Sequence, residues 1–445
     1  MRPSTTVVRK ALIGSFILSV LFNGASVSRA APANESIAEE LVESGSGPGV
    51  KIFDRIVHLG TEATIQVDII HDFNAIGLQP NAPVAREFVT SEIPVGGRAA
   101  ERTNRTVVSP NQSNLILWAD TDTEYGQAKI FVDFNMTKDL FGTDFEVYKA
   151  WAKFGYLRFG LDYTQFMNQV AIPETLDFEG PQLLPEARYA QAGFRIPIGH
   201  IVQVEKEHFF IHIGVETSKG QFTLDPLLDA TSEDQVPSVV AKLTYNTPKR
   251  NLELAGVYRR LRATGNNSYD SSVNGWGLYL SGYLRTWKKD SLMMGIIGGR
   301  GIGALIDDTS GLGLDAAAIS ATDDQLRPVG MVGAWVGYQH FWNEHFRSTA
   351  TAGYLKAYTQ FIDRNYGATV GGPNGPNTEF VGIYDETVYS SANLIWSPLP
   401  LFDAGIEYLY GRQKMAPGSS SYEQNATGHD HRIQVTLRLN FEYGR

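Results

Sequence analysis

The chain has 445 residues, with 38 lysines and arginines against 48 aspartates and glutamates, and a formal net charge of −10. It contains no cysteine, which excludes disulfides and metal–thiolate sites. The acidic balance argues against a nucleic-acid partner, because such partners select basic surfaces. We therefore expect a secreted or exported chain without nucleic acid, cofactor or metal.

The N-terminus has the pattern of a secretory signal peptide. Basic residues within the first ten precede an apolar run at 11–22, and the small-residue stretch GASVSRA ends at Ala30. The apolar run is too short to span a bilayer as a helix. Removal of residues 1–30 takes away four of the 38 basic residues, leaving 34 minus 48, or −14. Residues 31–62 are predicted to form a short periplasmic N-terminal segment.

From residue 63 onward, apolar and polar residues alternate over stretches of about ten residues, which indicates β-strands with one apolar face. The last stretch is the clearest, because every second residue from Ile433 to Tyr443 is apolar and those between are polar. The predicted strands number sixteen: 63–73, 112–119, 126–136, 144–154, 157–166, 187–196, 208–216, 238–246, 251–261, 275–287, 291–299, 329–339, 345–356, 385–396, 402–411 and 432–443.

The connections between these strands alternate between long and short almost throughout. Outer-membrane barrels have short periplasmic turns and long outer loops, whereas a soluble secreted β-sandwich has no reason to sort its loops in this way. We predict an all-β fold: a 16-stranded antiparallel transmembrane β-barrel at 63–445, with long extracellular loops and short periplasmic turns. A closed barrel of this size leaves an aqueous lumen and places the chain in outer-membrane lipid of a bacterial cell.

Four stretches carry a family resemblance: NQSNLILWADTDTEYGQAKIFVDFNM at 111–136, RFGLDYTQFMN at 158–168, PETLDFEGP at 173–181 and ARYAQAGFRIP at 187–197. Together they resemble the DcaP-like family of outer-membrane porins. The resemblance implies a homotrimer of sixteen-stranded porins that takes up small anionic solutes such as dicarboxylates. The chain departs from this family at 35–44, which is too short for the coiled coil that relatives often carry before the barrel.

If the apolar strand faces meet lipid, the opposite faces line the lumen. Basic side chains gathered on one wall would attract anions and set selectivity. The alternative is that they are ordinary solvated residues paired with carboxylates such as Asp68, Asp133 and Asp162. The candidate pore-lining residues are Lys129, Lys149, Lys153, Arg158, Arg195, Arg285 and Arg347.

The connection after the fifth predicted strand, residues 167–186, is a candidate constriction loop. Proline residues bracket its acidic side chains Glu174, Asp177 and Glu179. Folded into the lumen, these carboxylates would face the basic wall and orient a charged solute. An exposed acidic loop packed between subunits is the other interpretation.

Enzyme motifs are weak, so we predict that the chain is not an enzyme. GGRGIG at 298–303 lacks a surrounding βαβ unit, and no GxSxG motif marks a nucleophilic serine. The HDH triplet at 429–431 could hold a metal but is more simply a solvated loop. Passage of small anions is the preferred function; a nonspecific diffusion porin and, less favoured, a barrel-borne outer-membrane enzyme are the alternatives.

Overall fold

The computed structural model describes residues 49–52, 55–74, 76, 87–95, 104–136, 145–178, 180–198, 208–217, 219–224, 228–318, 325–362, 369–372, 375–377, 383–416 and 427–444. Across these ranges, no helix has the length and apolar character needed to cross a membrane. The predicted signal peptide and the residues up to 48 lie outside the described part.

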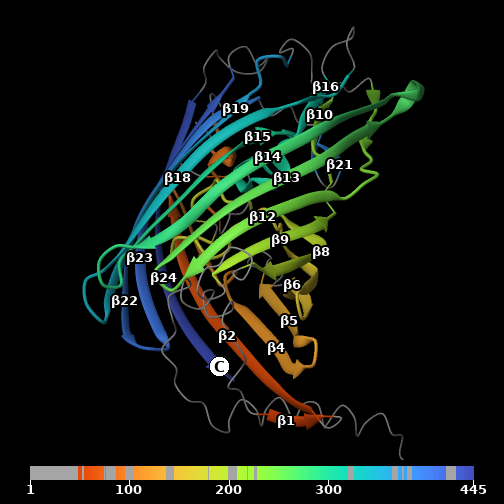
Figure 1. Cartoon of the computed structure of the whole chain (residues 1–445). Helices are drawn as coiled ribbons and strands as arrows, with labels where there is room; N and C mark the ends of the chain where they lie inside the picture. The colour runs from red at the N-terminus through yellow and green to blue at the C-terminus, as the bar shows by residue number, and fades with distance from the viewer. Residues whose placement is uncertain are drawn as a thin grey trace, which may run out of the picture.

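Sixteen strands close into one antiparallel barrel, as the sequence predicts (Figure 1). Each strand pairs with its neighbours, and the first and last strands pair with each other from Thr61–Tyr443 to Asp72–Arg432. The barrel strands are β2 (Arg55–Asp72), β4 (Asn114–Thr123), β5 (Gly126–Met136), β6 (Phe145–Phe154), β7 (Leu157–Tyr163), β8 (Arg188–Pro197), β9 (Phe209–Glu216), β12 (Ser238–Thr247), β13 (Arg250–Thr264), β14 (Asp270–Arg285), β15 (Ser291–Arg300), β18 (Gly330–Phe341), β19 (Phe346–Tyr358), β22 (Tyr384–Leu399), β23 (Phe402–Met415) and β24 (Thr427–Tyr443).

The second strand of the barrel is interrupted. A short strand, β3 (Arg105–Ser109), pairs with the outer half of β2, and β4 pairs with its periplasmic half. Pro110 lacks an N–H and ends the first ladder. Ser113 bridges the gap, because its Oγ accepts a hydrogen bond from Gln66 N at 3.0 Å and donates one to Gln66 O at 3.1 Å. The sequence pattern missed β3 for this reason.

The observed strand limits differ from the predicted ones mainly at the ends. The strand β2 begins at Arg55 rather than at 63, because residues 58–64 pair with β4 below the apolar part of its outer face. The strands β13 and β14 extend toward each other, so residues 265–269 alone connect them. The extra length is polar and lies beyond the apolar stretch by which the strands were recognised.

The wall of the barrel is uneven in height. The strands β6 to β9 have 10, 7, 10 and 8 residues. The strands β13, β14, β22, β23 and β24 have 15, 16, 16, 14 and 17 residues. Figure 1 shows the short strands on one side of the barrel; we call β6–β9 the low wall and the barrel strands from β13 to β24 the tall wall. One side of the molecule therefore presents much less outer surface than the other.

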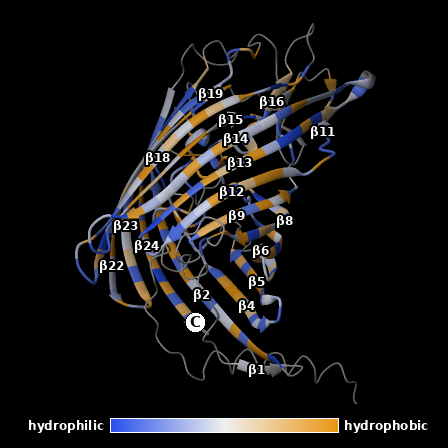
Figure 2. Ribbon diagram, viewed as in Figure 1, coloured by the Kyte–Doolittle hydropathy of each residue, from blue (hydrophilic) through white to orange (hydrophobic). Residues whose placement is uncertain are grey.

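The outer face of the barrel is apolar. Figure 2 shows hydrophobic and hydrophilic residues alternating along the strands. On the tall wall, Leu254, Leu278 and Ile296 point outward and are 47, 54 and 56% exposed. On β13, Arg259 points inward and is buried, whereas Arg260 is exposed on the outer face.

Shorter strands and turns lie outside the sixteen barrel strands. The strand β1 (Gly49–Ile52) pairs with the start of β2, and β11 (Thr231–Ser232) extends β13. The extracellular connections build a small second sheet and several 3-10 turns. The sheet consists of β10 (Phe222–Leu224), β16 (Ala316–Ala318), β17 (Arg327–Pro328), β20 (Thr369–Gly372) and β21 (Gly375–Asn377), and the 3-10 turns are η1 (Thr90–Glu92), η4 (Asn266–Ser268), η5 (Gly303–Leu305) and η6 (Asp307–Thr309).

A hydrophobic core lies inside the barrel, where a purely aqueous lumen was expected. It combines inward side chains of the tall wall, including Tyr279, Trp335 and Leu355, with apolar residues of the connection between β7 and β8. Phe166 and Leu183 of that connection have no exposed surface. The tall wall carries apolar residues on both faces because one face meets lipid and the other meets this loop.

Candidate pore and its lining residues

The connection between β7 and β8, residues 164–187, folds into the barrel; we call it the lumen loop. Its two ends are joined by a hydrogen bond from Thr164 N to Ala187 O at 2.7 Å. From there it crosses the interior to the opposite strands, where Asn393 Nδ2 donates to Glu174 O at 2.9 Å. The candidate constriction loop therefore lies inside the lumen.

Glycines on the inner face of the tall wall make room for the lumen loop. A Cβ atom on Gly333 would lie 2.0 Å from Leu183 Cδ2, and one on Gly337 would lie 2.9 Å from Pro173 Cγ. On β23, a Cβ on Gly405 would lie 2.8 Å from Leu176 Cδ1. These are contacts that real Cβ atoms essentially never make, so the loop occupies space that only glycine leaves open.

Buried ion pairs hold the middle of the lumen loop. Both carboxylate oxygens of Glu174 accept hydrogen bonds from Arg347, at 2.6 and 2.7 Å, and Arg438 lies 3.3 Å away. Asp403 contacts the same two arginines. Burial by itself raises the pKa of Glu174, but the two guanidinium groups outweigh it and hold that pKa below its ordinary value. The charges of two arginines and two carboxylates therefore cancel at the middle of the loop.

Asp177 forms a second anchor. Its Oδ1 accepts a hydrogen bond from Phe88 N at 3.0 Å and lies 3.7 Å from Arg432. The backbone N–H of Asp177 donates to Glu407 Oε2 at 2.9 Å. The predicted loop residue Glu179 lies outside the described residues. Glu174 and Asp177 therefore fasten the loop to its own wall rather than facing the basic wall across an open pore.

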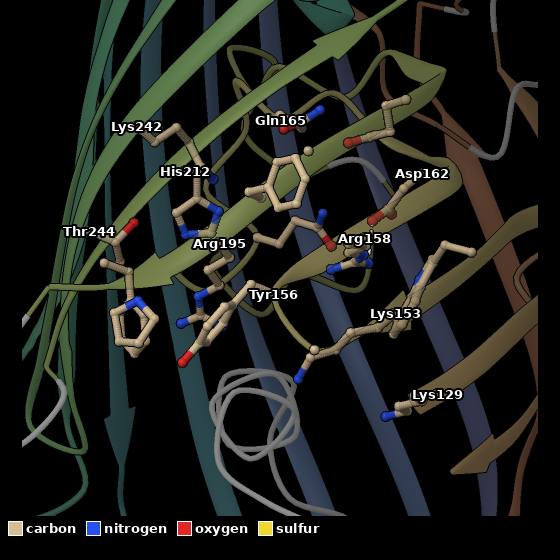
Figure 3. Close-up of a pocket in the computed structure, with 18 of the residues that line it drawn as sticks. Lys129, Lys153, Tyr156, Arg158, Asp162, Gln165, Arg195, His212, Lys242 and Thr244 are labelled. Atoms are coloured by element: carbon tan, nitrogen blue, oxygen red, sulfur yellow. Dashed lines mark hydrogen bonds and ion pairs between the residues drawn. The ribbon is translucent and has the colours of Figure 1, made fainter. Parts of the chain in front are cut away.

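A cavity of about 650 Å³ remains on the other side of the lumen, toward the periplasmic turns (Figure 3). Inward residues of β5–β9, β12 and β13 line it, and the first residues of the lumen loop close its upper side. Its lining contains five lysines and arginines and three carboxylates, together with His212. The basic members are Lys129, Lys153, Arg158, Arg195 and Lys242, and the acidic ones are Glu124, Asp162 and Glu253.

Strand register arranges these cations in two rows. Lys129 on β5 is opposite Lys153 on β6, which is opposite Arg158 on β7. Directly opposed residues on one face have Cβ atoms about 5 Å apart. The second row, Arg195, His212 and Lys242, runs across β8, β9 and β12. The sheet itself therefore concentrates positive charge on this wall.

Two glycines continue the line of the first row, because Gly193 is directly opposite Arg158. Gly193 on β8 is paired with Gly214 on β9, and a Cβ on either would collide with Gln165 Oε1, at 2.5 or 2.2 Å. The side chain of Gln165, the second residue of the lumen loop, thus lies over the bare backbone of these two glycines and faces the cavity (Figure 3). It adds a polar amide to the lining of the cavity.

Aromatic rings orient the arginines. The guanidinium carbon of Arg158 lies 3.8 Å from the centre of the Trp151 ring, and that of Arg195 lies 4.0 Å from the Phe210 ring. Planar guanidinium groups stack well on such rings, which fixes their direction. Arg158 also pairs with Asp162, and Lys242 Nζ lies 2.8 Å from Glu253 Oε1.

The candidate residues are only partly brought together. Lys129, Lys153, Arg158 and Arg195 share the cavity, as expected from their strands. Lys149 lies on the same wall but does not line the cavity, and its Nζ is 3.3 Å from Asp133. Arg347 anchors the lumen loop. Arg285 lies at a periplasmic turn, where it donates to the carbonyls of Pro248 and Lys289 at 3.2 and 3.4 Å.

Sequence reasoning missed two members of the cavity, His212 and Lys242. Both lie in strands that were correctly located, and each occupies an inward position by alternation with outward Ile213 and Val239. The alternation in those two strands already indicated that both side chains face inward. What alternation could not show is that β9 and β12 are neighbours of β8 at the level of Arg195.

The HDH triplet lies in β24 rather than in a loop. Its residues alternate in direction, so Asp430 is buried inside and His429 is exposed on the outer face. The three side chains cannot converge on one ion. Within the described ranges, no group of three histidines or carboxylates is arranged to hold a metal.

Comparison with solved structures places this architecture. The crystal structure of the outer membrane channel DcaP of Acinetobacter baumannii matches with a TM-score of 0.68 over 88% of this chain and 99% of that one, at 12% identity. The fold is that of an outer-membrane porin. An anion-selective porin from Comamonas acidovorans matches at a TM-score of 0.51 and 8% identity, over 86% of this chain and 100% of that chain.

The outer-membrane protein OmpT of Vibrio cholerae also matches, with a TM-score of 0.50 and 10% identity over 88% of this chain and 100% of that one. No family model matches the chain, and no curated protein matches it. The likeness is therefore one of fold. A closed barrel with an apolar outer face is a membrane-spanning barrel, and barrels of this kind reside in the bacterial outer membrane.

Proposed function

We propose that this protein is an outer-membrane porin for the passive diffusion of small anionic solutes, dicarboxylates among them. The observation that carries the proposal is the basic wall of the remaining cavity, with five lysines and arginines against three carboxylates. We further propose that residues 1–30 are a leader removed on export, which precedes a short periplasmic segment.

The position of the lumen loop directs solutes past the basic wall. Because the loop packs against the tall wall and its Glu174 and Asp177 are held there by arginines, a solute that crosses the barrel passes the basic rows instead. Low-dielectric walls and a narrow passage concentrate ions of the opposite sign. The wall accordingly favours anions although the chain as a whole is acidic.

We also propose that three copies associate through the low wall. The strand β7 has 7 residues, so it is about 23 Å long and rises about 18 Å at a typical tilt. This is less than the apolar band of about 25 Å that a lipid-facing wall needs. The outward side chains Phe159, Phe194 and Ile213 are nevertheless apolar and 46, 53 and 53% exposed. Neighbouring copies of the chain would cover this wall.

The test is the reversal potential of the refolded protein in a planar bilayer under a KCl gradient. We expect anion preference in the wild type and a clear reduction in Lys129→Gln/Lys153→Gln. The matched control, Lys288→Gln/Lys289→Gln, removes two exposed lysines from the turn at 286–290 and should leave the potential unchanged. A wild type without ion preference would identify a nonspecific diffusion porin instead.

The solute class needs a second measurement on the same membranes. Succinate added to one side should reduce the chloride current, and the reduction should weaken in Lys129→Gln/Lys153→Gln. An acetate control at the same charge concentration separates a requirement for two carboxylates from simple charge attraction. Equal effects of the two acids would leave anion passage standing and remove the dicarboxylate preference.

A further inference from the structure

The second row of the basic wall contains a group whose charge can change. His212 on β9 is directly opposite Arg195 on β8 and directly opposite Lys242 on β12. Figure 3 shows the three side chains one after another along the same side of the cavity. Histidine is the side chain whose ordinary titration falls between pH 5 and 8, whereas lysine and arginine stay charged there.

Among the described residues, no carboxylate forms an ion pair with His212. An imidazolium has two N–H donors, yet His212 Nε2 has no hydrogen-bond partner within the described residues. Two carboxylates of the cavity lining are paired with other groups, Asp162 with Arg158 and Glu253 with Lys242. Arg158 on β7 adds a further cation on the same wall.

We propose that Arg195, His212 and Lys242 form an anion-binding subsite at which anion binding is coupled to protonation of His212. This inference rests on the proposed anion pathway. In the empty row, a third positive charge between two cations is unfavourable. An anion held by Arg195 and Lys242 supplies the missing negative charge, and the imidazole then takes up one proton from the buffered solvent, leaving the buffer one proton poorer.

Linkage fixes the direction of the effect. If anion binding favours the protonated imidazole, protonation must strengthen anion binding by the same factor. Affinity for the anion therefore increases as the pH falls, by about tenfold per pH unit at most, because a single proton is involved. The subsite would retain anions longer in an acidic medium and release them in a neutral one.

The probe must keep its own charge over the whole pH range. Sulfate does so between pH 5.5 and 8, whereas a dicarboxylate begins to protonate. We would measure the reduction of chloride current by sulfate in planar bilayers at several pH values. For the wild type, the apparent sulfate affinity should be on the order of fivefold higher at pH 5.5 than at pH 8.

Variants separate His212 from the remaining groups. His212→Gln keeps a polar side chain that cannot be protonated, so the pH dependence should disappear. His212→Lys carries a fixed charge and should bind sulfate at pH 8 as the wild type does at pH 5.5. His429→Gln is the matched control, because His429 is exposed on the outer face of β24 and should leave the wild-type dependence intact.

The outcomes distinguish the two proposals. A pH-dependent sulfate affinity that survives in His212→Gln, or that is absent from an anion-selective wild type, would overturn the coupling and leave the porin proposal standing. A wild type with neither anion preference nor sulfate effect at any pH would remove the anion pathway itself. Calorimetric titration of sulfate in two buffers of different ionisation enthalpy should, in addition, show proton uptake in the wild type and none in His212→Gln.

Discussion

Leu183 of the lumen loop lies against the backbone of Gly333 on β18, so close that a Cβ on Gly333 would be 2.0 Å from Leu183 Cδ2. Leu183 has no exposed surface. The same Cβ on Gly333 would also lie 2.8 Å from the carbonyl oxygen of Tyr354. At this point the loop fits into the barrel because residue 333 has no side chain. This contact shows that the strands of the tall wall are shaped for the loop and not for lipid alone.

Gly333→Ala should displace the lumen loop. Overpacking of a buried contact costs about 1 to 3 kcal/mol, and the loop can yield more easily than the barrel wall. We expect a changed single-channel conductance with increased current noise in bilayers. The control is Gly256→Ala on β13, where the nearest atom to an added Cβ is 3.6 Å away. Wild-type conductance and noise in Gly333→Ala would show that Leu183 is not held as tightly as this contact requires.

Glu174→Gln should loosen the middle of the same loop. The substitution removes the charge that Arg347 and Arg438 share and leaves both arginines facing only Asp403. Removing one partner from a buried ion pair costs about 3 to 5 kcal/mol. We expect frequent transitions between conductance levels, recorded in single-channel traces. Glu344→Gln, in the periplasmic turn at 342–345, provides the comparison and should behave as the wild type.

The same carboxylate gives the loop a defined pH dependence. The pKa of Glu174 is held below its ordinary value of 4.5 by Arg347 and Arg438, against the effect of burial. A carboxylate with a depressed pKa stabilises the folded arrangement above its ordinary pKa and loses that contribution as the pH falls through the depressed value. Current noise should therefore rise below about pH 4.5. In Glu174→Gln the noise should be high already at neutral pH, and it should change less with acid than in the wild type.

The low and tall walls should respond differently to a charge on the outer face. Phe159→Arg, on β7, should separate the proposed trimer into monomers while leaving the barrel folded, as seen by light scattering in detergent. Leu278→Arg, on β14, faces lipid and should reduce folding into bilayers by about 2 to 4 kcal/mol. These two side chains are similarly exposed, at 46 and 54%. A trimeric Phe159→Arg protein would place the subunit contact elsewhere.

Much of the barrel could be predicted from sequence because its strands obey one local rule. From Ile433 to Tyr443 each second residue faces lipid, so the strand is visible as an alternation of apolar and polar residues in the sequence. The rule failed at β3, where Pro110 and Ser113 replace regular pairing, and at the polar outer ends of β13 and β14. Where a strand extends beyond the membrane, its residues no longer alternate between apolar and polar, so the pattern does not indicate a strand there.

The candidate site divides in the same way. Lys129, Lys153, Arg158 and Arg195 were recognised because strand phase points them inward. The role of Arg347 was not, since its partner Glu174 is 173 residues away in sequence. His212 was passed over for a similar reason, as its place between Arg195 and Lys242 depends on the register of three strands.

The sequence by itself determined the strands, their two faces, the alternation of loops and turns, and which cations face inward, because these depend on residues a few positions apart. The tertiary structure alone decided that the loop between β7 and β8 folds into the lumen, that Glu174 pairs with Arg347, and that the open cavity lies against the basic rows. These features depend on which strands become opposite each other when the barrel closes. Closure pairs residues that are far apart in the sequence, and the two-residue alternation along a strand carries no information about such pairs.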